Sequence, residues 1–244
     1  GIGPFYEKNN FFFSTINFLK KSDLLSVRDK LGSKICHDNL LDYTIGSDLV
    51  FSLPNSYWED FRNDSNSINS IAIIIRDWDF SKNEGSYIFS LINLKYKNCK
   101  INFISFCEKK DKKAIEYIMS TVYGNSIKIW NPNIMTFNSF LNDLSRYDIF
   151  ITSRYHGALI ASLLMKPFIS IGIEPKLTMV AELFEMPCWE FPYKIDQCQS
   201  FIENIDDNYT NMTQKISSYL KIEREKNVSM MNNLNNLIIK SLDN

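Results

Sequence analysis

The feature that most constrains the fold is a regular alternation of short apolar runs and longer amphipathic runs between residues 70 and 184. Strands that alternate with helices of about ten residues form a parallel sheet with right-handed crossovers. The sequence therefore predicts an α/β domain built on a Rossmann-type sheet. The predicted strands are 70–75, 100–107, 127–130, 149–152 and 168–173, and the predicted helices are 87–96, 111–123, 137–145, 158–165 and 177–184.

The division of the chain into domains follows from one polar stretch. Residues 55–69 are rich in Asn, Ser and Asp and show no sustained periodicity, which is typical of a linker. We therefore expect an incomplete N-terminal α/β domain, a Rossmann-like C-terminal domain, and one or two amphipathic helices that pack back on the N-terminal domain. The expected ranges are 1–55, 70–207 and 208–244. The chain opens with Gly1-Ile-Gly-Pro4, which looks like a loop after a strand, so we expect the first strands and helices of that domain to precede it.

Charge and cysteine content narrow the classes of function. Lys plus Arg is 27 and Asp plus Glu is 28, so there is no global basic field, and we expect no nucleic-acid partner. The 5 cysteines are scattered and lack a paired C-x-x-C spacing, which argues against a disulfide framework or a zinc site and indicates reduced, mostly buried thiols. No apolar run approaches the roughly 20 residues that span a bilayer. We expect a cytoplasmic protein, with peripheral association at the inner face of the membrane.

The predicted turn after strand 149–152 contains the side chains that are best suited to binding a ligand and to proton transfer. It reads Ser153-Arg-Tyr-His-Gly157 and precedes the predicted helix 158–165. In doubly wound sheets ligands bind at the carboxyl ends of strands, where helix N-termini converge. Arg154 offers a fork of donors for phosphate or carboxylate, and His156 can move a proton near neutral pH. The alternative, that Arg154 forms an ion pair and His156 caps the helix, stays open at this point.

Basic residues recur at other predicted strand ends. Arg76 follows the strand at 70–75, and Lys176 follows the strand at 168–173 within Glu174-Pro-Lys176. Carboxyl ends of parallel strands meet at one edge of a sheet, so these groups can face one crevice and bind an anion. A single arginine at a strand end is more often a salt-bridge partner. Arg28 ends a short predicted strand in the N-terminal domain.

Together these segments resemble the polysaccharide pyruvyltransferases over roughly residues 1–187. The resemblance implies a two-domain fold like that of GT-B glycosyltransferases, with the active site between the domains. Two positions depart from the family pattern: Tyr155 stands where Leu is usual, and Leu49 follows Asp48 where Pro is usual. The segments that carry the resemblance are Gly1-Ile-Gly-Pro4, Ser26-Val-Arg-Asp29, Asp48 with Phe51, Arg76-Asp77-Trp78, Ser153-Arg-Tyr-His-Gly157 and Glu174-Pro-Lys176.

The activity that the resemblance implies is transfer of a pyruvyl group from phosphoenolpyruvate to two hydroxyls of a sugar, with release of phosphate. The acceptor would be a saccharide or lipid-linked saccharide in the synthesis of a cell-surface polysaccharide or exopolysaccharide. No metal and no cofactor besides the donor are implied. We expect His156 and Arg154 to be catalytic. The residues expected to bind substrate are Arg28, Arg76, Ser153, Gly157, Lys176 and Gly3.

Two other functions fit the same sequence. A GT-B glycosyltransferase could use the same arginine and histidine to hold the diphosphate of a nucleotide sugar, because a fold does not fix a function. Alternatively, the chain could be a non-catalytic remnant or scaffold that binds a partner synthase through its C-terminal helices. In that case no small anion would bind, and removal of the residues after about 208 would abolish association.

Overall fold

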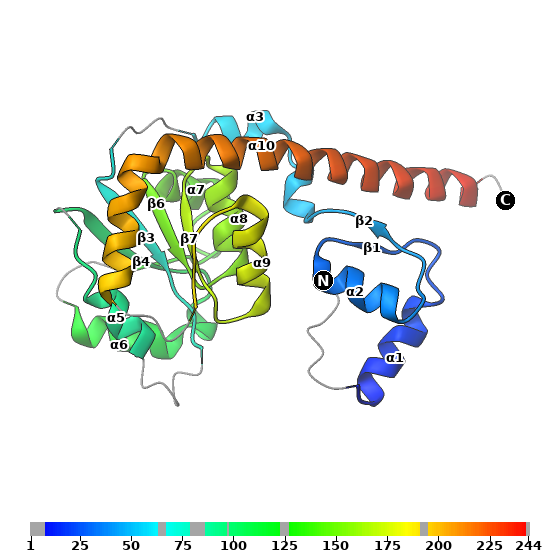
Figure 1. Ribbon diagram of the computed structural model, residues 1–244, viewed down its shortest axis with the longest axis horizontal. Helices are drawn as coiled ribbons and strands as arrows, with labels where there is room; N and C mark the ends of the chain where they lie inside the picture. Colours follow the sequence, from blue (N-terminus) through cyan, green and yellow to red (C-terminus); the bar gives the residue numbers. More distant parts are fainter. Residues whose placement is uncertain are drawn as a thin grey trace. The chain divides into compact units, whose positions relative to one another are not determined.

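The chain forms two compact units in the computed structural model, which describes residues 8–62, 67–78, 86–96, 98–122, 127–190 and 195–242. The smaller unit combines Gly1–Pro54 with Leu220–Asn244, and the larger unit is Asn55–Tyr219. Figure 1 labels the helices and strands of both units.

The larger unit is built on a six-stranded parallel sheet, which confirms the predicted α/β class. The strand order is β5-β4-β3-β6-β7-β8, and every neighbouring pair is parallel. The alternation in the sequence had predicted all of these strands except the short last one. The strands are β3 (Ser70–Ile74), β4 (Lys100–Ser105), β5 (Ile127–Ile129), β6 (Ile149–Thr152), β7 (Phe168–Ile171) and β8 (Cys188–Trp189).

The central strands are covered on both faces. Every residue of β6 and β7 is buried, and so are Ile71–Ile74 of β3. A strand that is buried on both faces has a continuous apolar sequence instead of an alternating one, which is the pattern of these runs. Figure 1 shows helices around this sheet, with α5 beside α6 and α8 beside α9. The helices of the larger unit are α3 (Asn55–Glu59), α5 (Ser86–Ile92), α6 (Lys112–Thr121), α7 (Phe137–Leu144), α8 (Tyr155–Leu163), α9 (Pro175–Phe184) and the first part of α10 (Ile195–Leu242).

The strand order creates a switch point between β3 and β6. From β3 the chain adds β4 and β5 on one side, and it then returns to place β6, β7 and β8 on the other side. Right-handed crossovers in opposite directions put the connecting helices on opposite faces, so the loops after β3 and β6 diverge at the carboxyl edge. Ligands of open α/β sheets bind in the crevice that this divergence leaves. The residues that follow β3 and β6 are therefore the ones placed for function.

The helix after β6 begins earlier than predicted. Helix α8 starts at Tyr155 and not at residue 158, because the carbonyl of Arg154 already accepts hydrogen bonds from the backbone N–H groups of Gly157 (2.9 Å) and Ala158 (3.3 Å). Arg154 is thus the N-cap residue, and Tyr155, His156 and Gly157 form the first helical turn. The prediction that placed these three residues in a loop, with the helix N-terminus at Gly157, is wrong.

The smaller unit contains a two-stranded parallel sheet and a small apolar core. Helices α1 (Asn10–Leu19) and α2 (Lys30–Asp38) each begin with a side-chain cap: Asn9 accepts from Phe12 N (3.1 Å) and Asp29 accepts from Gly32 N (2.7 Å). Its core cluster consists of Phe12, Ile16, Val27, Cys36 and Leu41. The elements are α1 (Asn10–Leu19), β1 (Ser26–Val27), α2 (Lys30–Asp38), β2 (Thr44–Ile45), the 3-10 helix η1 (Leu49–Ser52) and the end of α10.

Two segments differ from the sequence prediction. The stretch predicted as a linker begins with helix α3, because Trp58 is fully buried and the Tyr57 hydroxyl donates to Asn138 Oδ1 of α7 at 2.6 Å. The amphipathic C-terminal region forms one helix, which is within the expected one or two, but this helix has 48 residues and already begins at Ile195 instead of near residue 208. No helix in the described residues is long and apolar enough to cross a membrane.

The cysteines whose side chains the structure describes are less buried than predicted, and the side chain of Cys198 lies outside the described residues. Cys36, Cys99, Cys107 and Cys188 are free thiols, but only Cys36 is buried and the other three are partly exposed. Burial raises the pKa of Cys36, and burial together with the charges of Asp148 and Asp206 raises the pKa of Cys99 to about 11. Both thiols therefore stay protonated, and weakly nucleophilic, at neutral pH.

The contact between α8 and β6 supplies a stability prediction. A Cβ added at Gly157 would lie 2.3 Å from Thr152 Oγ1 and 2.8 Å from Ile74 Cδ1, so Gly157→Ala must push the helix off the strand. We expect the variant to lose about 1–3 kcal/mol of unfolding free energy in urea denaturation. The matched control is Gly172→Ala, whose Cβ meets Cys188 Sγ at 3.1 Å. Equal losses in the two variants would contradict this account.

Candidate functional site

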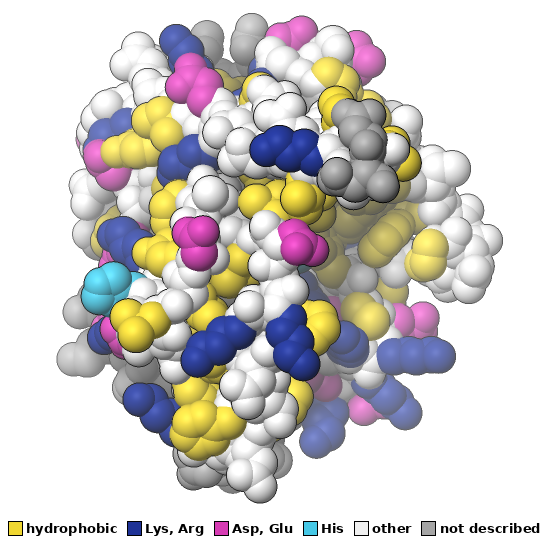
Figure 2. All heavy atoms as spheres, turned by 90° about the vertical axis from the view of Figure 1, so that its right-hand side faces the viewer, with side chains coloured by type: hydrophobic (Ala, Val, Ile, Leu, Met, Phe, Trp, Pro, Cys, Tyr) yellow, Lys and Arg dark blue, Asp and Glu magenta, His cyan; other side chains and the backbone are white. Residues whose placement is uncertain are grey.

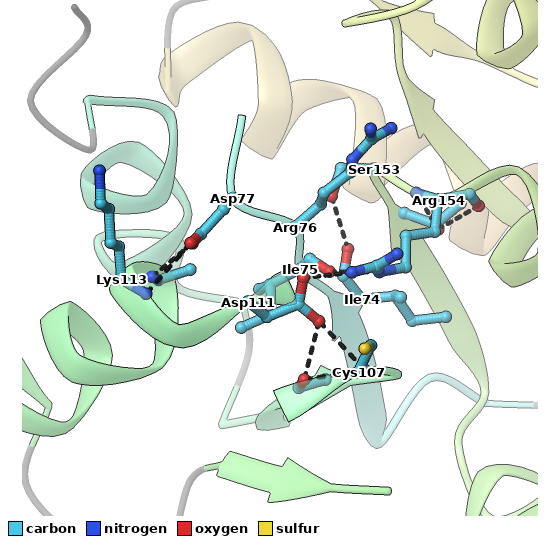
Figure 3. Close-up of polar contacts among 12 residues, drawn as sticks. Ile74, Ile75, Arg76, Asp77, Cys107, Asp111, Lys113, Ser153 and Arg154 are labelled. Atoms are coloured by element: carbon cyan, nitrogen blue, oxygen red, sulfur yellow. Dashed lines mark hydrogen bonds and ion pairs between the residues drawn. The ribbon is translucent and has the colours of Figure 1, made fainter. Parts of the chain in front are cut away.

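The guanidinium of Arg154 lies across the switch point of the sheet (Figure 3). Its Nε donates to the carbonyl of Ile75 at 3.0 Å, and its Nη2 pairs with Asp111 Oδ1. Nη1 makes no hydrogen bond to any residue that the structure describes. The side chain is 17% exposed, so two of its nitrogens are held by the protein while Nη1 can still reach a ligand.

Asp111 is the buried anchor of this arrangement. Its side chain is 0% exposed, and besides Arg154 it accepts from Ser105 Oγ at 2.7 Å and from Cys107 N at 3.3 Å. Although Asp111 stands at the N-cap position of α6, its side chain does not cap that helix. The capping comes from Asp77, whose two oxygens accept from Lys113 N (3.1 Å) and Ala114 N (2.7 Å), as Figure 3 shows.

A second set of ion pairs lies on the other side of the switch point. Arg76 Nη1 pairs with Glu174 Oε1, and Lys176 Nζ lies 2.5 Å from Glu174 Oε2. Glu174 is the N-cap residue of α9 and follows β7. One carboxylate therefore draws together two of the basic residues that the sequence analysis had picked out.

The two arginines cross the boundary between β3 and β6 in opposite directions. Arg154 follows β6 and reaches over β3 to Asp111 beyond β4, whereas Arg76 follows β3 and reaches past β6 to Glu174 beyond β7. Among the described residues, the side chains of Arg154, Arg76 and Lys176 gather here with the carboxylates of Asp111 and Glu174, and Asp77 lies at the N-terminus of α6. Guanidinium and ammonium groups of this kind can bind an anionic ligand.

Ser153 and Gly157 have structural contacts at this turn. The hydroxyl and the backbone N–H of Ser153 both donate to the carbonyl of Ile74 at 3.0 Å, and the residue is fully buried. Thr152 Oγ1 accepts from Arg154 N at 3.0 Å and donates to Arg154 O at 2.8 Å. Gly157 admits α8 close to the strand. These contacts fix the backbone from which the side chains of Arg154 and His156 project.

His156 is exposed on the first turn of α8, and its ring meets that of Tyr155 edge to face, with centroids 5.4 Å apart. An exposed imidazole at a strand end can exchange a proton with a bound substrate. The alternative that it caps the helix is not what the structure shows, because Arg154 occupies the N-cap position.

Arg28 and Gly3 belong to the smaller unit. Arg28 Nη1 pairs with Asp48 Oδ2, and its Nε lies 3.8 Å from Asp29 Oδ2. Gly3 lies outside the described residues. The structure thus brings Arg76, Arg154, Ser153, Gly157 and Lys176 to one edge of the larger unit, with His156 on the adjoining helical turn.

Sequence reasoning assigned no role to Asp111 or Glu174. A carboxylate after a strand end next to a predicted anion site was the available signal, because a buried arginine needs a counter-charge. Among the described residues, no group of three or more His, Cys, Asp and Glu side chains is arranged to hold a metal ion.

Comparisons with known proteins agree with the family resemblance and the fold that the sequence predicted. A sequence model for the family described as polysaccharide pyruvyl transferase matches residues 1–175, which include the turn after β6. No curated protein gives a match. Solved structures of GT-B glycosyltransferases share the fold, which confirms the predicted GT-B-like architecture. One neighbour is Anabaena HepE in complex with UDP-glucose, with 11% identity over 92% of this chain and 67% of that chain and a TM-score of 0.56. TarM has 13% identity over 96% of this chain and 48% of that chain, with a TM-score of 0.57. A Rickettsia africae glycosyltransferase has 14% identity over 97% of this chain and 68% of that chain, with a TM-score of 0.54.

The anchoring of Arg154 generates a prediction for Asp111→Asn. This change keeps the side-chain shape but leaves the partly buried guanidinium without its counter-charge, so we expect a loss of about 2–4 kcal/mol of unfolding free energy. Urea denaturation measures it. In the control, Asp143→Asn, the lost partners are the surface residues Lys128 (3.5 Å) and Arg146 (3.9 Å), and we expect a loss below about 1 kcal/mol. Similar small losses in both variants would show that Asp111 is not an anchor.

Proposed function

Because the chain belongs to the polysaccharide pyruvyl transferase family, we propose that it transfers a pyruvyl group from phosphoenolpyruvate to a saccharide. The observation that carries the proposal is that the family match contains the turn after β6, where Arg154 and His156 accompany Arg76, Glu174 and Lys176 at the switch point. The family supports a transferase with a saccharide acceptor. The donor and the residue roles are our proposals.

The donor chemistry matches the charges at this edge. Phosphoenolpyruvate carries a phosphate and a carboxylate, so it needs two groups of donors. Nη1 of Arg154, at the N-terminus of α8, can meet one of these groups. Arg76 and Lys176 can meet the other, with Glu174 holding the two cations together until the substrate competes for them. On the face in Figure 2, side chains of both signs are interspersed.

The reaction requires one proton to reach carbon. Protonation of the methylene carbon of phosphoenolpyruvate gives an oxocarbenium-like centre at C2, which a sugar hydroxyl attacks. A second hydroxyl then displaces phosphate, and a cyclic ketal is formed. Of the two hydroxyl protons, one balances the new methyl group and one leaves with phosphate. His156 is the group that we assign to give and take these protons, a role worth about 10²–10⁴ in rate.

No cofactor besides the donor is part of this proposal. We also propose that the acceptor is a saccharide or lipid-linked saccharide of a surface or exopolysaccharide. The scattered cysteines, which lack a paired C-x-x-C spacing, suit a reducing compartment, so we place the reaction in the cytoplasm, at the inner face of the membrane when the acceptor is lipid-linked.

The alternative function is that of a GT-B glycosyltransferase with a nucleotide-sugar donor. It is favoured by the structural neighbours, since HepE was solved in complexes with UDP-glucose and with UDP. The identities of 11% and 13% extend this argument to the fold alone. A diphosphate would use the same basic groups, so titrations with UDP and UDP-glucose must accompany those with phosphoenolpyruvate.

Donor binding is tested by calorimetric titration with phosphoenolpyruvate, because no acceptor is needed. We expect saturable binding that weakens by about tenfold or more in Arg154→Lys, since this variant keeps a charge opposite Asp111 but loses the Nη1 donor. Arg146→Lys, at an exposed ion pair, is the matched control and should bind normally. Binding of UDP with none of phosphoenolpyruvate would move the assignment to a glycosyltransferase.

The role of His156 is tested with His156→Ala. We expect affinity for phosphoenolpyruvate to stay within about twofold, while phosphate release in the presence of a panel of hexose glycosides falls by about 10²–10⁴. The matched control is His37→Ala, another exposed histidine, which lies beside Asp38. Normal turnover in His156→Ala would refute the catalytic assignment.

A further inference from the structure

A run of exposed lysines follows β4 at the carboxyl edge of the larger unit. The run spans the 3-10 helix η2 (Glu108–Lys110) and the first turn of α6. Of its two carboxylates, Glu108 is exposed, whereas Asp111 is buried and pairs with Arg154. The part of the run that faces solvent is therefore mostly basic. Its lysines are Lys109, Lys110, Lys112 and Lys113, and all of them are exposed.

The positions of these lysines do not favour the stability of α6. Lys112 and Lys113 are the first two residues of the helix, where the positive end of the helix dipole disfavours a cation. Lys112 lies 3.8 Å from Glu116, but both side chains are largely exposed, and a pair of this kind adds little stability. In Figure 3 the side chain of Lys113 extends away from Arg154. Clustered charge that opposes local stability is typical of a surface that meets a partner of opposite charge.

The loop after β5 lies beside this run. Strand β5 pairs with β4 in parallel, so both loops leave the sheet at its carboxyl edge. The backbone N–H of Trp130 donates to the carbonyl of Ser105 at 2.9 Å, which joins the segments that follow the two strands. The rings of Phe106 and Phe140 also meet edge to face, with centroids 5.5 Å apart. The two loops therefore form one continuous surface.

The turn after β5 presents an apolar side chain to solvent. The carbonyl of Asn131 accepts from the backbone N–H groups of Ile134 (3.0 Å) and Met135 (3.1 Å), and its side chain accepts from Asn133 N at 2.9 Å. These hydrogen bonds fix the turn, and Ile134 on it is 80% exposed. Phe137, at the start of α7, is 38% exposed. An apolar side chain held in water gains free energy when it enters an apolar medium.

We propose that the lysine run and the Ile134 turn together form a docking surface for an anionic lipid bilayer. The lysines attract negatively charged head groups, and the isoleucine enters the boundary between head groups and acyl chains. A soluble polyanion would use the lysines but would gain nothing from Ile134, so the combination favours a bilayer. Strand β4 lies next to β3, so the docking surface adjoins the edge that holds Arg154. That this bilayer carries a lipid-linked acceptor rests on the proposed function.

The test is co-sedimentation of the full chain with lipid vesicles in the absence of any substrate. The probes are vesicles of phosphatidylcholine alone and vesicles in which about one lipid in four is phosphatidylglycerol. We expect saturable binding to the anionic vesicles, and binding to the neutral vesicles that is weaker by about tenfold or more. Added salt should weaken the binding to anionic vesicles, because it screens exposed charges.

Two lysine pairs separate the docking surface from the net charge of the chain. We expect Lys109→Gln combined with Lys110→Gln to weaken binding to anionic vesicles by about tenfold or more, since one lysine near a charged membrane contributes about fivefold. The matched control is Lys20→Gln combined with Lys21→Gln, which removes the same charge from two adjacent exposed lysines of the smaller unit. The control should bind like the unchanged chain.

An isoleucine pair tests the apolar part of the surface. We expect Ile134→Ser to weaken binding to anionic vesicles by about threefold to tenfold, because less apolar area enters the bilayer. The matched control is Ile239→Ser, at an isoleucine of α10 that is 57% exposed. The exposed side chains changed in these variants contribute little to packing, so melting temperatures should stay close to that of the unchanged chain.

The outcomes distinguish this inference from the proposed function. The docking surface is overturned by absent binding to anionic vesicles, by equal binding to neutral ones, or by equal losses in the lysine pair and its control. Polygalacturonate is the probe for a soluble polyanion, and its binding without any vesicle binding overturns the surface as well. Vesicle binding by a chain that fails to bind phosphoenolpyruvate keeps the docking surface and refutes pyruvyl transfer. Binding of phosphoenolpyruvate without vesicle binding does the reverse.

Discussion

The ion pair between Arg154 and the buried Asp111 is the interaction on which the functional edge depends. It links the loop after β6 to the loop after β4. The Nε of Arg154 also donates a hydrogen bond to the carbonyl of Ile75, at the end of β3. Arg76 and Glu174 make the complementary link toward β7. A parallel sheet ends in unpaired backbone groups and diverging loops, so crossing side chains of this kind hold the crevice in one shape.

The same contacts limit what the basic residues can do for a ligand. Two nitrogens of Arg154 are committed to the protein, which orients Nη1 at little further entropic cost when a ligand arrives. Glu174 holds Arg76 and Lys176 in a cluster and moderates their charge. The carboxylates of Asp111 and Glu174 therefore limit how much of this basic charge is available to a ligand.

The larger unit brings Arg154, Arg76 and Lys176 to one edge of a fold shared with GT-B glycosyltransferases. Each of these three side chains is paired with a carboxylate, so a ligand at this edge must compete with Asp111 or Glu174. The fold alone does not fix the ligand, since the neighbours with the same architecture include one in complex with UDP-glucose.

The alternation of apolar and amphipathic runs by itself determined the α/β class, five of the six strands in the larger sheet, and the position of Arg154 and His156 after a strand. Strand β8 was not predicted, because it has only two residues and shows no periodic pattern. Only the tertiary structure decided which side chains meet. Asp111 and Glu174 lie 43 and 98 residues from the arginines that they bind, and their proximity depends on the strand order. A hydrophobic period reports which face of an element is buried, but it carries no information about which strands become neighbours.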